Sequence, residues 1–171
     1  MSLSQESGSR QVPELQQNLA ILKEVAFFNG FPQEVLKLLA YLCVRGDYES
    51  GDTLLEKGDD PGLALCILSG TAALYREGKN GFEKLRTYSE GEFLGGLTLL
   101  GPMTALFSLK AETKIKVLIL TREQFSKVLE KHPELNPLLR KAVLQQLRRW
   151  EQTNVDELES CCLRKVGVTL L

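Results

Sequence analysis

Residues 91–113, G-E-F-L-G-G-L-T-L-L-G-P-M-T-A-L-F-S-L-K-A-E-T, decide the expected fold of this chain. The pattern of apolar and turn-forming residues predicts three elements within this stretch. They are a short edge strand at 92–94, one helical turn at 97–100 and a strand at 104–110. The segment therefore predicts a strand, a tight corner and a return strand.

Two glycines, Gly95 and Gly96, stand at the corner between the first strand and the helical turn. Glycine lets the backbone bend so that its N–H groups point inward, and the positive end of the next helical turn points to the same spot. A phosphate or another anion could be bound there by the main chain alone. The corner therefore predicts an anion cradle.

The stretch resembles the phosphate-binding cassette of the cyclic nucleotide-binding domain family, which includes the cyclic AMP receptor protein and the regulatory subunits of protein kinase A. The family pattern is F-G-E-L-A-L, a short loop, then P-R-A-A-T-V-x-A. Residues 94–99 take the place of the first motif without a gap, and residues 104–111 take the place of the second. The resemblance implies a ligand pocket formed by Gly95, Gly96, Leu97, Thr98, Ala105, Leu106, Ser108 and Trp150.

Two polar ligands of the family pattern are missing. Gly96 stands where the family has the glutamate that binds the ribose 2′-hydroxyl, and Ala105 stands where it has the arginine that pairs with the cyclic phosphate. Losing one side of a buried Arg–phosphate pair costs about 2 to 5 kcal/mol, and losing the sugar hydrogen bond costs about 1 to 3 kcal/mol. Because this amounts to roughly a thousandfold in affinity, we expect weakened or lost cyclic AMP binding. The alternative is that Arg86 or Glu112 supplies the missing partner.

Trp150 occupies the position, counted from His132-Pro133, at which the cyclic AMP receptor protein has a helix residue that touches the adenine. Its indole could stack on a base-like ligand, or it could fill the pocket itself. The small side chains at positions 96 and 105 leave room for either arrangement. Both interpretations remain open, with self-filling or an apolar ligand slightly favoured over a nucleotide.

Composition and charge indicate a single cytoplasmic domain. The chain has 171 residues, 43% hydrophobic and 25% charged, with a net charge of −1, so it lacks the basic surface that nucleic acid or an acidic membrane would attract. No apolar run reaches transmembrane length, and the polar N-terminus has no signal-peptide core. We expect residues 1–11 to be a disordered tail.

The remainder of the chain predicts a mainly β fold with flanking helices. Residues 12–42 show helical periodicity, and residues 43–120 show short strands cut by turns every eight to twelve residues or so. Such strands are typical of a sandwich or barrel. The resemblance specifies a double-stranded β-helix, or jelly-roll, barrel with the cassette at residues 91–111.

Residues 121–163 predict helices that end the domain, followed by a tail at 164–171. T-R-E-Q at 121–124 is a capping box, and Asn136 with Pro137 can start a final helix. An apolar stripe follows that helix, and its residues are Leu135, Leu139, Val143, Leu147, Trp150, Asn154, Leu158 and Cys162. We expect its first two turns to pack on the barrel, and the rest to form a homodimer seam.

Several function classes lack their signatures. The chain has no nucleophile elbow, P-loop or metal-ligand spacing, so we expect neither an enzyme nor a metal site. Its single histidine and four cysteines do not form a ligand set, and Cys66 lies in an apolar strand, where a buried inert thiol is expected. No helix-turn-helix follows the final helix, so DNA binding by this chain alone is not expected.

Two functions remain. One is a ligand-sensing regulatory domain, in which a small effector, a cyclic nucleotide or another molecule, changes the position of the final helix. The other is a protein-interaction module that uses a degenerate barrel as a scaffold. We favour a stand-alone, non-catalytic, cyclic nucleotide-binding-like regulatory domain.

Overall fold

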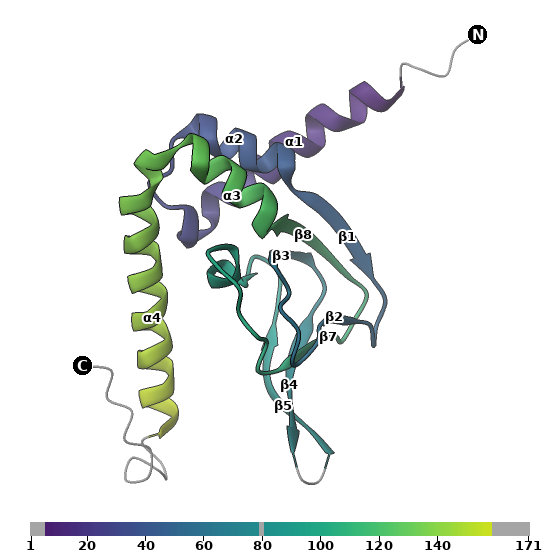
Figure 1. The fold of residues 1–171 in the computed structure, drawn as a ribbon. Helices are drawn as coiled ribbons and strands as arrows, with labels where there is room; N and C mark the ends of the chain where they lie inside the picture. Colours follow the sequence, from purple (N-terminus) through teal and green to yellow (C-terminus); the bar gives the residue numbers. More distant parts are fainter. Residues whose placement is uncertain (1–5, 79–80, 159–171) are drawn as a thin grey trace.

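Two four-stranded antiparallel sheets form the centre of the molecule (Figure 1). The computed structural model describes residues 6–78 and 81–158. The first sheet has the order β1-β8-β3-β6 and the second has the order β2-β7-β4-β5. The strands are β1 (Val44–Tyr48), β2 (Thr53–Leu55), β3 (Leu63–Ser69), β4 (Ala72–Gly78), β5 (Gly81–Tyr88), β6 (Phe93–Leu94), β7 (Ser108–Ala111) and β8 (Ile115–Thr121).

The two sheets pack face to face over an apolar cluster. The first sheet contributes Leu65 and Val117 among others, and the second contributes Leu109 and Ala111. Each of these side chains is almost completely buried. The predicted mainly β, jelly-roll architecture is therefore confirmed.

β3 and β8 are buried on both faces, which explains why the sequence of β3, L-A-L-C-I-L-S, is an almost continuous apolar run. Leu65 faces the second sheet, whereas its neighbour Cys66 packs with the helices. Burial raises the pKa of the Cys66 thiol to about 11, as expected for an unreactive thiol. The first sheet is thus the middle layer between the helices and the second sheet.

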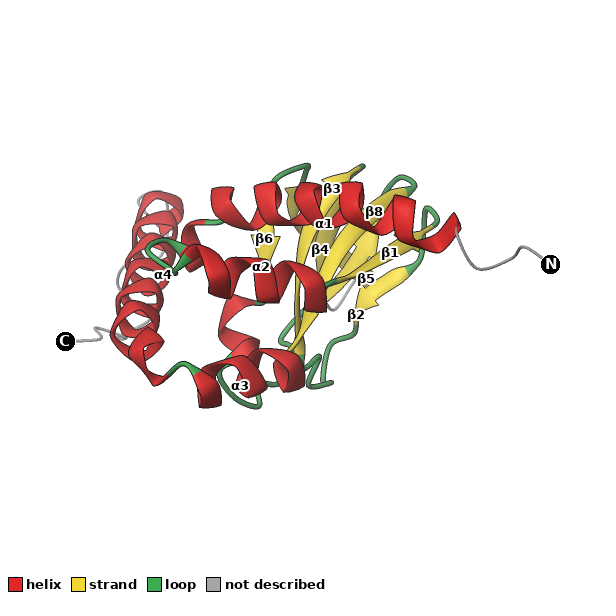
Figure 2. Ribbon diagram, turned by 90° about the horizontal axis from the view of Figure 1, so that it is seen from above, coloured by secondary structure: helices red, strands yellow, loops and turns green. Residues whose placement is uncertain are grey.

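The N-terminal helices are α1 (Glu6–Glu24), the 3-10 turn η1 (Ala26–Phe28) and α2 (Gln33–Leu42). They cover one end of the sheets, and α1 and α2 lie side by side (Figure 2). Arg45 on β1 donates to the Oδ1 of buried Asn18 at 3.1 Å and so attaches α1 to the sheet. Residues 6–11, which the sequence assigns to a disordered tail, lie in α1, because this helix begins at Glu6. Pro13 lies inside the same helix.

Five phenylalanines join the helices to the cassette. The ring centres in contact lie 5.3 to 6.4 Å apart, and the residues are Phe27, Phe28, Phe31, Phe93 and Phe125. They come from η1, the loop before α2, β6 and the α3 helix (Arg122–Lys131). Since Phe93 belongs to the cassette, the aromatic cluster is a direct contact between the cassette and the helices.

Of the two C-terminal helices, the first begins as the sequence predicts and the second does not. Thr121 and Gln124 form both hydrogen bonds of the predicted capping box at the start of α3. The 3-10 turn η3 (Pro133–Leu135) continues directly into α4 (Asn136–Leu158), so Asn136 is itself helical and does not cap the helix.

The start of α4 contacts the η1 turn. Leu135 of η3 and Leu139 of α4 are buried in a cluster that contains Phe27 and Phe28 together with side chains of β3 and β8. The part of the stripe beyond residue 158 lies outside the described residues.

Candidate functional site

The glycine corner of the cassette has the predicted shape. β6 leads into η2 (Gly96–Leu99), and Gly95 between them has a φ of +78°. A Cβ on Gly95 would lie 2.7 Å from the carbonyl oxygen of Leu63. Glycine is therefore required at position 95 for two reasons: the backbone there is left-handed, and β3 lies too close for a side chain.

Thr98 holds the corner closed. Its hydroxyl lies 2.5 Å from the Leu63 carbonyl oxygen and 2.7 Å from the Gly95 carbonyl oxygen, and its N–H donates to Gly95. Among the residues that the structure describes, no acceptor is found for the N–H groups of Gly96 and Leu97. In the predicted anion cradle, these two N–H groups are the donors that are available to an anion.

Gly96 faces the aromatic cluster. A Cβ at this position would lie 3.0 Å from the Cδ2 of Phe27 and 3.0 Å from the Cε1 of Phe93. A side chain at position 96 therefore requires the Phe27 and Phe93 rings to move by a few tenths of an ångström. A Cβ at position 96 would thus point towards the aromatic cluster.

The main chain of Ala105 is fixed by the turn between β2 and β3. Its N–H donates to the carbonyl oxygen of Asp59 and its carbonyl accepts from the N–H of Gly58, both at 2.8 Å. This isolated pair replaces the predicted start of a strand, because β7 begins only at Ser108. The adjacent Leu106 side chain is 72% exposed.

An ion pair that the sequence did not reveal joins α3 to the turn between β2 and β3, and its arginine also contacts the cassette. Arg122 donates to both carboxylate oxygens of Asp60 and, through Nε, to the carbonyl oxygen of Thr98. Asp60 Oδ1 also accepts from the N–H of Met103 at 3.3 Å. Mainly because of the Arg122 hydrogen bonds, the pKa of Asp60 is lowered from 3.8 to about 2.

This shift predicts a specific acid sensitivity. Because the pKa of Asp60 is lower in the folded chain, its stabilising effect is complete above about pH 4 and is lost as pH falls towards 2. At pH 6, Asp60→Asn should unfold at a lower urea concentration than the unmodified chain. The difference between the two urea midpoints should be smaller at pH 2.5. The control is Asp59→Asn, since no side-chain bond of Asp59 is found within the described part of the chain. An equal gap at both pH values would contradict this role.

The two residues considered as substitutes for the missing ligands have other partners. Arg86 pairs with Glu92 at 2.9 Å and lies 4.7 Å from the centre of the Tyr88 ring. Glu112 pairs with Lys84 at 2.5 Å and accepts from the Thr87 hydroxyl. The Lys84 hydrogen bond is the main reason why the pKa of Glu112 is lowered.

The structure places Ser108 on β7, away from the buried inner face of that strand. Leu109, the next residue along β7, is buried between the two sheets. Because neighbouring residues of a strand point to opposite faces, Ser108, which pairs with Tyr75, lies on the outer face of β7. It lines a cavity of about 320 Å³ there and accepts from the N–H of Lys57. The backbone of Trp150 lies in α4, and its side chain is outside the described part of the structure.

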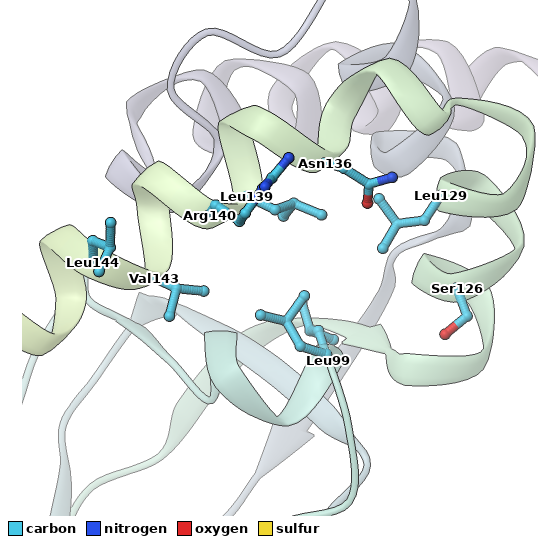
Figure 3. Close-up of a pocket in the computed structure, with 9 residues that line it drawn as sticks. Leu99, Ser126, Leu129, Asn136, Leu139, Arg140, Val143 and Leu144 are labelled. Atoms are coloured by element: carbon cyan, nitrogen blue, oxygen red, sulfur yellow. The ribbon is translucent and has the colours of Figure 1, made fainter.

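A larger apolar groove lies between η2, α3 and α4 (Figure 3). Its volume is about 730 Å³. The lining residues are Leu99, Leu100, Ser126, Leu129, Asn136, Leu139, Arg140, Val143 and Leu144. The hydrophobic periodicity of the final helix identifies Leu139 and Val143 as part of its apolar stripe. No motif near these residues indicates which part of the cassette they contact. We call this space the α4 groove.

Neither a metal centre nor a membrane span is found in the described residues. Residues 6–78 and 81–158 contain no cluster of three or more His, Cys, Asp or Glu side chains placed to bind a metal ion. Within the same ranges, none of the helices combines the length and the apolar character needed to cross a bilayer.

Comparison with known proteins gives the family. A model of the cyclic nucleotide-binding domain matches residues 45–132, just over half of the chain. The match includes the sheets, the cassette and α3. The chain therefore belongs to the cyclic nucleotide-binding domain family.

Individual relatives agree with this assignment. The cAMP-dependent protein kinase regulatory subunit of Emericella nidulans is 34% identical over 112 residues, which cover 64% of this chain and 26% of that protein. The match thus spans about a quarter of the length of this curated relative.

Solved structures have the same fold. A cyclic nucleotide-binding-like protein from Brucella abortus is 31% identical, with a TM-score of 0.62, covering 67% of this chain and 98% of that chain. A cyclic nucleotide-binding domain from Methylobacillus flagellatus is 20% identical, with a TM-score of 0.70, covering 92% of this chain and 86% of that chain. The second likeness concerns the fold alone.

Proposed function

We propose that this chain is a non-catalytic, ligand-sensing regulatory domain with weakened or lost ordinary cyclic AMP binding. The observation that carries the proposal is the cassette itself, in which Gly96 and Ala105 stand where the family pattern has glutamate and arginine. The corner keeps its shape through Gly95 and Thr98. The chain thus has the scaffold of the site without its two polar ligands.

The surroundings of the cassette support the proposal. The guanidinium of Arg122 is bound to Asp60 and Thr98, and that of Arg86 is bound to Glu92. A phosphate would have to displace one of these carboxylates before either arginine could bind it. We also expect the domain to act in the cytoplasm and not to bind DNA by itself.

A thermal-shift experiment tests weakened binding. For a dissociation constant near 10 μM, 1 mM cyclic AMP would stabilise the chain by about 2.7 kcal/mol, or roughly 5 to 10 °C in melting temperature. We expect a shift below about 1 °C, because millimolar affinity gives only a few tenths of a kcal/mol. The control is 5′-AMP at the same concentration, which detects non-specific effects of the nucleotide. A shift of several degrees with cyclic AMP alone would contradict the proposal.

We further propose that α4 mediates a homodimer. Leu147, which belongs to the predicted stripe on α4, is 41% exposed, so the described part of this chain does not cover it. An exposed leucine in a heptad-like apolar stripe is typical of a helix that pairs with another helix. A parallel pair of α4 helices would bury it.

Removing residues 150–171 should convert the dimer into monomers, because it deletes the outer half of the proposed seam. Leu147→Glu should have the same effect by placing like charges opposite each other across the two-fold axis. Sedimentation velocity measures both results. A dimer that persists in the truncated chain would place the interface elsewhere, and an unmodified chain that is monomeric at 100 μM would rule out a stable dimer.

A further inference from the structure

The α4 groove has the size and composition of a small-molecule site. Its volume of about 730 Å³ lies in the range of roughly 300 to 1,000 Å³ that is usual for ligand pockets. Six of its nine lining residues are leucine or valine, and these come from η2, α3 and α4. In Figure 3, Leu99, Leu129, Leu139 and Val143 surround a common space.

The polar side chains of the groove favour a negative ligand group. They are Ser126, Asn136 and Arg140, and none of the nine lining residues is acidic. Asn136 and Arg140 are one helical turn apart and therefore share a face of α4. Within the described residues, no ion pair of Arg140 with a carboxylate is found, unlike Arg76, Arg86 and Arg122.

We propose that the α4 groove binds an amphipathic monocarboxylic acid, with its hydrocarbon chain against the leucines and its carboxylate at Arg140 and Asn136. The inference rests on the proposed ligand-sensing function and names the chemical class of the effector. A single guanidinium matches one carboxylate, and the apolar lining matches an alkyl chain. A cationic ligand would be repelled by Arg140. A nucleotide would leave its polar base and sugar groups against leucine side chains.

Such a ligand would connect the cassette to the final helix. Leu99 and Leu100 belong to the cassette turn, and Val143 and Leu144 belong to α4, so the alkyl chain would contact both elements at once. A ligand that contacts both elements stabilises the arrangement that lets it do so. Occupancy of the groove would therefore bias the position of α4 without any bond to the cassette N–H groups.

Decanoic acid is the probe for the test, used below its critical micelle concentration. We expect saturable changes in the NMR methyl signals of Leu99, Leu139 and Leu144. Arg140→Gln should weaken decanoate binding by about three- to tenfold, whereas Lys141→Gln, the adjacent cation outside the lining, should not change it. 1-Decanol, which has no charge, should bind both variants equally.

Ser126→Trp should fill the groove and abolish decanoate binding. Unchanged amide spectra elsewhere in the chain would show that the fold of this variant is intact.

Three results would overturn the inference. The first is the absence of saturable methyl shifts, and the second is equal decanoate affinity in Arg140→Gln and Lys141→Gln. The third is coverage of the groove by a second copy of the chain, seen as Leu99 and Leu129 methyl signals that change on dilution without ligand and as decanoate failing to compete. The proposed function and this inference can fail separately. If the chain binds both cyclic AMP tightly and decanoate, only the proposal of weakened cyclic AMP binding is contradicted. If it binds neither compound, only this inference is contradicted.

Discussion

Replacing Ala105 by arginine is expected to raise the affinity for cyclic AMP by at least about thirtyfold, because a phosphate–guanidinium pair contributes roughly 2 to 5 kcal/mol. The main chain at position 105 is held at 2.8 Å on both sides by Gly58 and Asp59, so the new side chain starts from a fixed backbone. The N–H groups of Gly96 and Leu97 would then share the anion with the new guanidinium. Isothermal titration of both chains with cyclic AMP measures the gain.

The matched control is Leu106→Arg, which adds the same charge one residue further along. Leu106 is largely exposed, so an arginine there would remain in solvent and should change the affinity by less than about threefold. Equal gains from both variants would show only a general charge effect. No gain from Ala105→Arg would mean that position 105 does not face the ligand, and the interpretation of the cassette would be wrong.

The missing glutamate is a different case. Because a side chain at Gly96 meets Phe27 and Phe93 at 3.0 Å, Gly96→Glu has to open the aromatic cluster before its carboxylate can reach a sugar. We therefore expect Gly96→Glu to lower the free energy of unfolding and to add less to affinity than Ala105→Arg does. The sequence pattern treats the two absences alike, whereas the structure separates them.

Phe28→Ala is expected to lower the free energy of unfolding by about 3 to 5 kcal/mol. The Phe28 ring is only 2% exposed and contacts four other rings, those of Phe27, Phe31, Phe93 and Phe125. Its removal leaves a cavity at the contact between η1, the cassette and α3, which the surrounding helices cannot easily close. Urea unfolding followed by circular dichroism measures the change.

Phe82→Ala is the matched control, since it deletes the same atoms from a side chain that is 64% exposed. It should cost less than about 1 kcal/mol, because little apolar area returns to water. If Phe28→Ala also costs less than about 1 kcal/mol, the aromatic cluster does not hold the cassette to the helices.

The elements that follow local rules were predictable from the sequence. The capping box at Thr121, the glycine corner at Gly95 and the alternation of short strands and turns all depend on residues close together in the chain. The fold followed from them once their order was compared with the family pattern.

The contacts that surround the site were not predictable, because they join distant segments. Asp60 and Arg122 are 62 residues apart, and nothing near either residue indicates the other. The α4 groove combines side chains from the cassette turn, α3 and α4, which are far apart in the sequence. The predicted strand at 104–110 is present only from Ser108 onward, since Ala105 pairs with the distant turn at Gly58.

Calorimetric titration of the unmodified chain with cyclic AMP and cyclic GMP tests the central claim most directly. The account predicts no saturable heat below about millimolar concentration, because the two polar ligands together are worth roughly a thousandfold in affinity. Micromolar binding of either nucleotide would contradict it, and would mean that another residue of this chain binds the cyclic phosphate in place of the missing arginine.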